Sequence, residues 1–275
     1  MTLRRLRRAV PDTPLSPPAA PSIPRFDVLG VSVSAMDLPI AVAAILAAAR
    51  ERRKGYICVT GVHGITEAQS DPEFRRILNG AFLNTTDGMP LVWLGRHYVR
   101  PGIQRVYGPD LLLAVFAATQ SVPFRHFFYG GAAGVAEELK ARLEARFPGV
   151  QIVGTYTPPF RPLNPSEENE LVAQIRAVQP DLMWVGLSTP KQERFMAEYL
   201  PRLDVTLMAG VGAAFDFHSG RIRQAPAWMQ RSGLEWLYRL CSEPRRLARR
   251  YLVINPLFLW RIAGQLLCRR VAAAL

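Results

Sequence analysis

The chain contains little cysteine. Its three cysteines are Cys58, Cys241 and Cys268, which share no metal-ligand spacing and cannot all form disulfide pairs. This excludes a small disulfide scaffold and favours a reducing compartment. With 275 residues, 49% hydrophobic and 20% charged, the chain is too apolar to be disordered. Its length suits one large domain with an appendage, or two small domains.

Long hydrophobic runs are also lacking. The longest apolar stretches are residues 39–49 and 252–260, and both are shorter than the roughly 20 residues that a helix needs to cross a bilayer. No apolar segment follows the basic N-terminus, where residues 11–24 hold six prolines instead. This composition predicts a flexible leader over residues 1–25 and argues against a signal peptide.

Acidic residues are scarce at the two ends of the chain, so the net positive charge is concentrated there. The formal net charge is +12, from 34 basic and 22 acidic residues. Residues 1–10 contribute +4, and residues 221–275 contribute +9 because 11 arginines there face only Glu235 and Glu243, so the remaining residues sum to −1. A nearly neutral body with basic ends predicts an end that docks on an anionic surface or ligand.

Short apolar segments alternate with helical ones over most of the chain. We expect strands at residues 26–34, 56–60, 81–85, 124–129, 150–155, 182–187 and 205–211. Helices are expected between them, with Asp37 and Asp71 as N-terminal caps. Continuous apolar strands separated by helices are typical of a parallel sheet covered on both faces. Residues 26–220 are therefore predicted to form an α/β, Rossmann-like core that binds ligands at the carboxyl ends of its strands.

The alternation stops near residue 221. The last part of the sequence predicts helices at about 226–232, 234–241 and 244–270, which together form a basic helical appendage over residues 221–275. Its arginines are interleaved with aromatic residues, a pattern typical of a helix at an anionic membrane surface. Nucleic acid is the competing partner, and a packed helix with a solvated arginine face is the structural alternative.

Three loops that follow predicted strands carry candidate functional residues. Asp87 stands before Gly88, where its carboxylate is placed to act as a general base, although an Asp-Gly turn explains the pattern on local grounds. Gly130 and Gly131 join a strand to a helix, as phosphate-binding loops and tight packing both require. Gln192 opens a helix, where it suits either a sugar or base contact or a solvated helix start.

A fourth strand end adds two residues. Thr60 ends the segment YICVT and His63 follows it, so either side chain is expected to face the same cleft as Asp87. A single histidine is more often a structural hydrogen-bonding group than a catalyst, and neither a Ser-His-Asp set nor a metal-ligand set accompanies it in the sequence.

Taken together, several segments resemble the WecG/TagA/CpsF glycosyltransferases of bacterial surface-polymer synthesis. They run in family order over about residues 27–258 and include DPEFRRILNGAFLNTTDGMPLVW, RVYGPDLL, FYGGAAGVAEELKARLEARFPG, PDLMWVGLSTPKQERF and GVGAAFDFHSGRIRQAPAWMQRSGLEWLYRLCSEPRRLARRYL. The resemblance implies an inverting transfer of a hexosyl or N-acetylhexosaminyl unit from a UDP-sugar to a polyprenyl-diphosphate-linked sugar. It also implies no required metal ion or other cofactor, and a cytoplasmic protein held on the inner face of the plasma membrane.

The resemblance also suggests roles for individual residues. Asp87 matches the family's proposed base, Thr60 and Gln192 match cleft residues near donor and acceptor, and Arg105 matches the arginine of an RxxGxD element. The tail arginines thought to complete the active site on the membrane correspond to Arg239, Arg246 and Arg249.

The sequence departs from the family pattern at one place. Many members have Thr-x-Asn after the second strand, whereas Thr60 is followed here by Gly61 and Val62, with His63 next. The identity of the donor and acceptor sugars therefore stays open.

Two other classes of function also remain open. One is a non-catalytic protein that binds a nucleotide sugar or a lipid diphosphate, against which the retained Asp87 and Gln192 argue. The other is a nucleic-acid binder, which rests on charge alone and is disfavoured because the arginines lie beside aromatic residues in one helical tail. A homo-oligomer is compatible with everything in the sequence.

Overall fold

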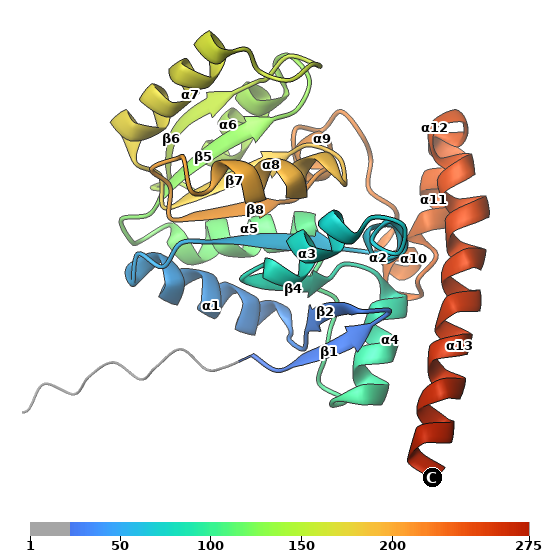
Figure 1. Cartoon of the computed structure of the whole chain (residues 1–275). Coiled ribbons are helices and arrows are strands. Elements are labelled where there is room, and N and C mark those ends of the chain that lie inside the picture. Colours follow the sequence, from blue (N-terminus) through green and yellow to red (C-terminus); the bar gives the residue numbers. More distant parts are fainter. Residues whose placement is uncertain (1–22, 275) are drawn as a thin grey trace, which may run out of the picture.

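A six-stranded parallel sheet forms the centre of the computed structural model (Figure 1), which describes residues 23–274 without the side chains of residues 246, 249, 250 and 269–274. In spatial order the strands are β4 (Leu83–Thr86), β3 (Gly55–Thr60), β8 (Leu207–Gly210), β7 (Leu182–Gly186), β5 (Arg125–Gly130) and β6 (Gln151–Tyr156). Each strand is parallel to its neighbours. The predicted α/β, Rossmann-like fold is confirmed, and most of the predicted leader lies outside the described residues.

Helices cover both faces of the sheet. One face packs against α1 (Leu38–Arg50), α5 (Gly108–Thr119), α6 (Val135–Arg146) and α9 (Ala214–His218). The other packs against α2 (Val62–Glu67), α3 (Pro72–Gly80), α4 (Met89–Tyr98), α7 (Pro165–Val178) and α8 (Lys191–Tyr199). In β5, Phe128 enters the first core while Phe127 and Tyr129 enter the second. Burial on both faces explains why the strands read as continuous apolar runs.

The two predicted aspartate caps are confirmed. The Asp37 carboxylate accepts a hydrogen bond of 2.9 Å from the Ile40 amide at the start of α1. Asp71 accepts one of 2.9 Å from the Phe74 amide at the start of α3. Each cap satisfies an amide that the first helical turn leaves without an intrahelical partner.

Residues 26–34 form a hairpin, so the prediction of a single strand there was wrong. β1 (Arg25–Val28) and β2 (Val31–Ser34) pair antiparallel in a separate two-stranded sheet. The turn places Leu29 at φ 53° and Gly30 at φ 79°, and left-handed values at both positions are typical of a tight hairpin turn. Leucine is unusual there, and its amide donates to Gln265 Oε1 at 2.7 Å, so a distant helix stabilises the turn.

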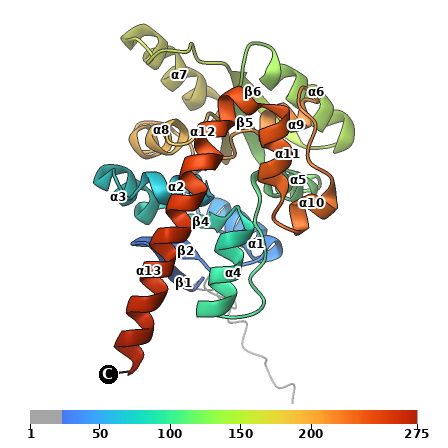
Figure 2. The ribbon, with the colours of Figure 1, turned by 90° about the vertical axis from the view of Figure 1, so that its right-hand side faces the viewer.

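Helices alone follow α9 within the described residues. They are α10 (Ala227–Arg231), α11 (Glu235–Ser242), α12 (Pro244–Arg249), the π-helical turn η1 (Arg250–Ile254) and α13 (Asn255–Ala274). The three predicted helices are therefore present, and the last contains a π-helical turn that the sequence did not predict. Figures 1 and 2 both show α13 as a long rod along one flank of the body, beside α2.

One side of α13 is fixed to the body. Phe258 and Ile262 are buried in the second core, and Gln265 Nε2 donates to the Asp27 carbonyl at 3.1 Å. The stretch from Tyr251 to Cys268 is also long and apolar enough to cross a membrane by length and composition, with mean hydropathy 1.3. The sequence prediction found no membrane-spanning segment here because the longest uninterrupted apolar run in this region, residues 252–260, is short. The predicted boundary near residue 220 stays a prediction, although these contacts show that removing residues 221–275 would uncover part of the core.

A buried histidine lies in the first core. The His126 ring is fully buried and stacks on Phe116, with ring centroids 4.0 Å apart. Its Nδ1 accepts from Trp184 Nε1 at 3.2 Å, so Nε2 carries the proton and donates to Thr119 Oγ1 at 2.9 Å. Burial lowers the pKa of His126 to about 3. The folded protein therefore keeps this imidazole neutral.

We expect His126 to make the fold sensitive to acid. Between the ordinary pKa of 6.5 and about 3, the unfolded chain takes up a proton that the folded chain excludes. The free energy of unfolding therefore decreases as the pH falls through this window. In urea unfolding between pH 7 and pH 4, the wild type should lose about 1 kcal/mol more per pH unit than His126→Gln. His97→Gln, which removes an exposed imidazole, is the control. Parallel curves for wild type and His126→Gln would contradict this role.

Candidate active site

A cavity of about 610 Å³ lies at the carboxyl ends of β3 and β4, under the C-terminal helices. The loops after these two strands form one part of its wall, from Gly61 to His63 and from Asp87 to Pro90. Trp93 of α4, the segment before α5 and residues of the C-terminal helices complete it. Parallel sheets bind ligands at this edge, so the cavity is the candidate active site.

Threonines at the end of β4 fix the segment that carries Arg105. β4 is an edge strand of the six-stranded sheet, so no further strand of that sheet binds the hydrogen-bonding groups on its outer side. Instead, Thr85 Oγ1 donates to the Val106 carbonyl at 3.0 Å, and Thr86 Oγ1 donates to the Gln104 carbonyl at 2.8 Å. The Val106 amide returns a bond of 3.0 Å to the Thr86 carbonyl. These bonds hold Arg105 beside the residue that follows β4.

That residue is Asp87. Its amide donates to the Thr60 carbonyl at 3.1 Å, which ties the loop after β4 to the end of β3. Gly61 leaves room for the carboxylate, because a Cβ atom at Gly61 would lie 3.3 Å from Asp87 Oδ2. Asp87 is half-buried on the cavity wall. A carboxylate held at a strand end and facing a cavity is placed to accept a proton from a bound hydroxyl.

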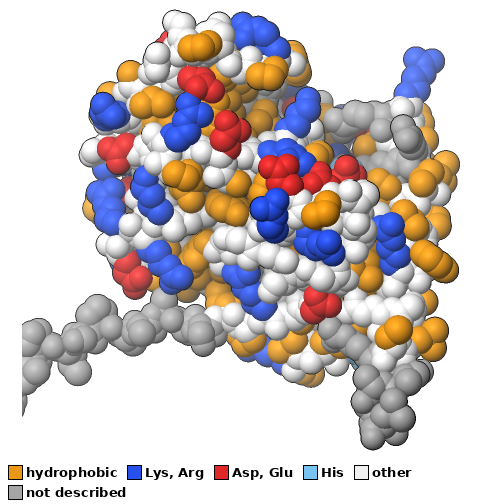
Figure 3. All heavy atoms as spheres, in the orientation of Figure 1, with side chains coloured by type: hydrophobic (Ala, Val, Ile, Leu, Met, Phe, Trp, Pro, Cys, Tyr) orange, Lys and Arg blue, Asp and Glu red, His pale blue; other side chains and the backbone are white. Residues whose placement is uncertain are grey.

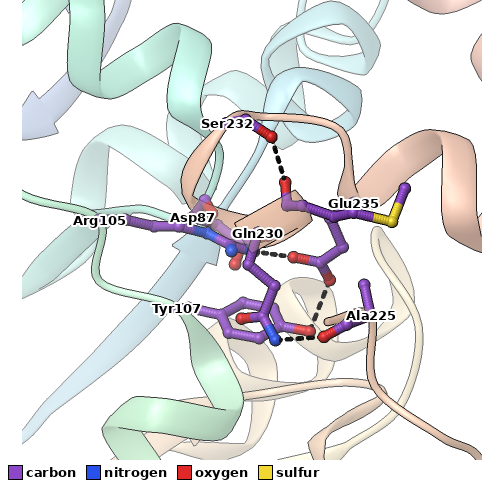
Figure 4. Close-up of polar contacts among 8 residues, drawn as sticks. Asp87, Arg105, Tyr107, Ala225, Gln230, Ser232 and Glu235 are labelled. Atoms are coloured by element: carbon purple, nitrogen blue, oxygen red, sulfur yellow. Dashed lines mark hydrogen bonds and ion pairs between the residues drawn. The ribbon is translucent and has the colours of Figure 1, made fainter. Parts of the chain in front are cut away.

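Arg105 connects Asp87 to the C-terminal helices (Figure 4). Its Nε donates to the Asp87 carbonyl at 2.5 Å, and its Nη2 donates to Glu235 Oε2 at 2.5 Å. The guanidinium lies over the Tyr107 ring, 3.8 Å from the centroid, and the Tyr107 hydroxyl donates to Glu235 Oε1 at 2.7 Å. Both oxygens of one carboxylate from α11 therefore bind side chains that precede α5.

Burial and neighbouring charges fix the protonation states of Arg105 and Tyr107. Burial opposes the positive charge of Arg105, but the carboxylates of Asp87 and Glu235 outweigh it, so the pKa of Arg105 lies above its ordinary value. Burial and the Glu235 carboxylate raise the pKa of Tyr107. At neutral pH the arginine therefore stays a cation and the phenol stays a neutral donor.

The opposite wall is apolar. Large hydrophobic side chains from α4, η1, α13 and the start of α11 line it and remain well exposed: Trp93 53%, Leu234 36%, Trp236 37%, Leu252 64% and Leu259 64%. Exposed apolar groups of this size, gathered at one cavity, are typical of a binding surface. A polar corner at Asp87 and an apolar wall suit a ligand that is itself part polar and part hydrocarbon.

Comparison with known proteins identifies the family. Residues 26–272 match the Glycosyl transferase WecG/TagA/CpsF family. The chain belongs to this family. It is also 32% identical over 197 residues to the N-acetylglucosaminyldiphosphoundecaprenol N-acetyl-beta-D-mannosaminyltransferase of Bacillus spizizenii, an alignment that covers 71% of this chain and 75% of the relative. The resemblance read from the sequence is thereby confirmed, and the chain is a glycosyltransferase.

The structure brings four of the predicted site residues of this glycosyltransferase to one cavity: His63, Asp87, Arg105 and Arg239. Arg239 extends from α11, with its guanidinium 5.7 Å from the centroid of the Phe217 ring. Arg246 and Arg249 belong to α12, but their side chains lie outside what the structure describes. The substrate contacts of all these residues stay predictions.

Thr60 and Gln192 are both buried and are not among the residues that line the cavity. Gln192 Nε2 donates to Glu193 Oε1 at 3.0 Å, and Thr189 Oγ1 donates to the same oxygen at 2.9 Å. Within the described part of the chain, Thr60 Oγ1 and Gln192 Oε1 have no hydrogen-bond partner. A buried polar atom without a partner is costly. A bound substrate would supply the missing hydrogen bonds, so the substrate contacts predicted for Thr60 and Gln192 remain predictions.

Packing accounts for Gly130 and Gly131 at the carboxyl end of β5. Gly130 has φ 116°, and a Cβ there would lie 2.7 Å from the Gly186 carbonyl oxygen on β7. Gly131 has φ 81°, and its amide donates to the same oxygen at 3.0 Å. Neither residue lines the cavity. Backbone conformation and close packing against β7 therefore explain both glycines without a ligand. Their predicted phosphate contact stays a prediction.

Sequence reasoning missed several residues of the site. Glu235 was counted only as a charge that partly offsets the arginines, and Tyr107 and Trp93 were not singled out. The available signal was an acidic residue at the start of a helix in a segment dominated by arginine. Among the described residues, no group of three or more His, Cys, Asp or Glu side chains is placed to hold a metal ion.

We expect Gly130→Ala to destabilise the fold. The substitution combines a left-handed backbone with a Cβ that meets the Gly186 carbonyl oxygen, and the expected loss is about 1–3 kcal/mol of unfolding free energy. Thermal unfolding measures it, with Gly102→Ala as the matched control, because a Cβ at Gly102 meets nothing within 4 Å. Unchanged stability together with lost UDP binding would instead favour a phosphate-binding role.

Proposed function

We propose that this glycosyltransferase moves a hexosyl or N-acetylhexosaminyl unit from a UDP-sugar, with inversion, to a polyprenyl-diphosphate-linked sugar in exopolysaccharide or other cell-surface polymer synthesis. The observation that carries the proposal is the cavity itself, which sets the carboxylate of Asp87 against an apolar wall at the carboxyl edge of the sheet. The relative from Bacillus spizizenii is named for an acceptor that joins N-acetylglucosamine through diphosphate to a polyprenol. We extend that acceptor class to this chain.

A single displacement at the sugar fits the carboxylates of the cavity. Asp87 takes the proton of the acceptor hydroxyl as its oxygen forms a bond to the anomeric carbon. The bond from that carbon to UDP breaks on the opposite face, and UDP leaves with the electron pair. Retention through a covalent glycosyl intermediate would instead need a carboxylate that attacks the anomeric carbon as a nucleophile. Among the described lining residues the other carboxylate is Glu235, which Arg105 and Tyr107 already engage.

Arg239 is suited to the UDP leaving group. Its guanidinium lies on the cavity wall, and among the described residues no carboxylate forms an ion pair with it. A cation placed where negative charge develops stabilises the transition state most in a site that excludes water. In this proposal Arg239 and the arginines of α12 take the part that a metal ion plays in other transferases.

The lipid part of the acceptor suits the apolar wall, and α13 suits the membrane that contains it. Trp260 and Leu267 of α13 are seven residues apart, so they share a helix face, and they are 74% and 63% exposed. Figure 3 shows hydrophobic side chains along the edge formed by α13. Because Phe258 and Ile262 bind the opposite side to the body, we propose that α13 lies on the cytoplasmic membrane surface instead of crossing it.

Asp87→Asn tests the chemistry. Asparagine keeps the size of the side chain but cannot take a proton, and general base catalysis is worth about 10²–10⁴-fold. We expect turnover with a panel of UDP-sugars and a lipid-linked acceptor to fall within that range, while UDP binding measured by calorimetry is kept. The anomeric configuration of the wild-type product, read by NMR, tests inversion, and activity in excess EDTA tests metal independence. UDP binding with no transfer by the wild type would favour a non-catalytic binding protein.

Trp260→Glu tests the membrane surface. A charge in the exposed face of α13 removes the burial of a large side chain, and we expect binding to anionic vesicles to weaken by at least about tenfold. Co-sedimentation at low and high salt measures it. Phe160→Glu is the matched control, because Phe160 is 96% exposed on the loop before α7, away from the appendage. Equal weakening by both variants would show that α13 is not the docking face.

A further inference from the structure

Glu235 contributes no proton to the proposed reaction, yet its carboxylate makes two of the hydrogen bonds that organise the cavity. It is the first residue of α11, and it binds Arg105 and Tyr107, which are about 130 positions earlier in the chain. The side chains of Arg105 and Glu235 are only 17% and 12% exposed. The same arginine donates to the carbonyl of Asp87. A continuous set of bonds therefore runs from the appendage to the residue proposed as the base.

We propose that Glu235 is a positioning residue that holds Arg105 against the Asp87 loop, so that Arg105 places the base and does not bind the donor diphosphate. The inference rests on the proposed function of Asp87. It also gives α11 a direct part in the catalytic site, because the loop after β4 takes its working position only when α11 is packed over it.

The local charge supports different roles for Arg105, which places the base, and Arg239, which is suited to the diphosphate. Asp87, Arg105 and Glu235 together carry a net charge of −1, so the group does not attract a diphosphate. A diphosphate on Arg105 would lie beside two carboxylates, or would displace Glu235 and leave a buried carboxylate with only the Tyr107 hydroxyl. Arg239 lies on the same cavity without a carboxylate in an ion pair with it among the described residues, so its charge is available to a ligand.

Stacking fixes the direction of the guanidinium. Tyr107 lies under Arg105 at 3.8 Å and presents its hydroxyl to the same carboxylate. With one face covered and two nitrogens bonded, the arginine has one orientation, and Nε points to the Asp87 carbonyl. Loss of the carboxylate would remove the partner of Nη2 and release this orientation.

The experiment compares Glu235→Gln and Glu235→Ala with the wild type, with Glu138→Gln as the matched control. Glu138 accepts from Arg221 at 3.0 Å, so its replacement also breaks an ion pair between the core and the start of the appendage, but away from the cavity. Turnover, UDP affinity and thermal stability are measured for each protein. Hydrogen exchange of peptides covering residues 86–92 is measured without substrate.

We expect Glu235→Ala to lower kcat by about 10²-fold, the effect of a misplaced catalytic group, with UDP affinity unchanged within about twofold. Glu235→Gln keeps the shape of the side chain and part of its hydrogen bonding, so kcat should fall less, by about 10-fold. Both substitutions of Glu235 should speed hydrogen exchange of the backbone amides in residues 86–92. Glu138→Gln should keep the turnover and the exchange of the wild type. If the alanine variant unfolds, the glutamine variant carries the comparison.

Three results would overturn the inference. Tighter UDP binding by Glu235→Gln with unchanged turnover would make Arg105 a diphosphate ligand restrained by Glu235. Equal losses in Glu138→Gln and Glu235→Gln would assign the effect to general docking of the appendage. Unchanged exchange in residues 86–92 would show that no coupling reaches the loop. A wild type that transfers no sugar, but shows the expected exchange pattern, would reject the proposed function and leave the positioning role supported.

Discussion

A buried guanidinium requires an anionic partner, and in this chain the partner comes from another part of the sequence. Arg105 is fixed to the end of β4 by the threonines beside it, and its charge is balanced by Glu235 of α11. Removing one member of such a pair leaves an uncompensated buried charge, so the two segments are strongly constrained to meet. The rest of the site follows from that contact, because α11 then covers the carboxyl ends of β3 and β4 and the cavity is enclosed between them.

Local chemistry determines much of this fold, and the sequence predicts that part well. Apolar strands between helices fix a parallel sheet, and Asp37 and Asp71 fix where helices begin. The hairpin at residues 25–34 was not predictable in the same way. Its turn contains Leu29 at positive φ, and the stabilising partner is Gln265 of α13, so the information lies far along the chain. The π-helical turn η1 likewise carries no local sequence signal that we recognise.

The candidate site shows the same division. Asp87, His63 and the two strands before them were predictable, because parallel strands bring their carboxyl ends to one edge. Gln192 and Thr60 follow the same rule, yet both are buried and neither lines the cavity, since burial depends on which helices cover each strand end. Glu235 was not predictable from spacing, because its role exists only through a contact across the fold. The family match supplies the reaction class, which no spacing in this sequence specifies.

The contact between Gln265 and the β1–β2 hairpin joins the last helix of the described chain to its first strands. A nascent chain emerges from the ribosome with its N-terminus first, so the sheet has its strands available well before α13 does. One wall of the cavity, from Tyr251 to Leu259, is then added last. A polypeptide that ends before Tyr251 therefore retains the strands of the sheet but lacks this wall, so the cavity is enclosed only after the segment up to Leu259 has been made.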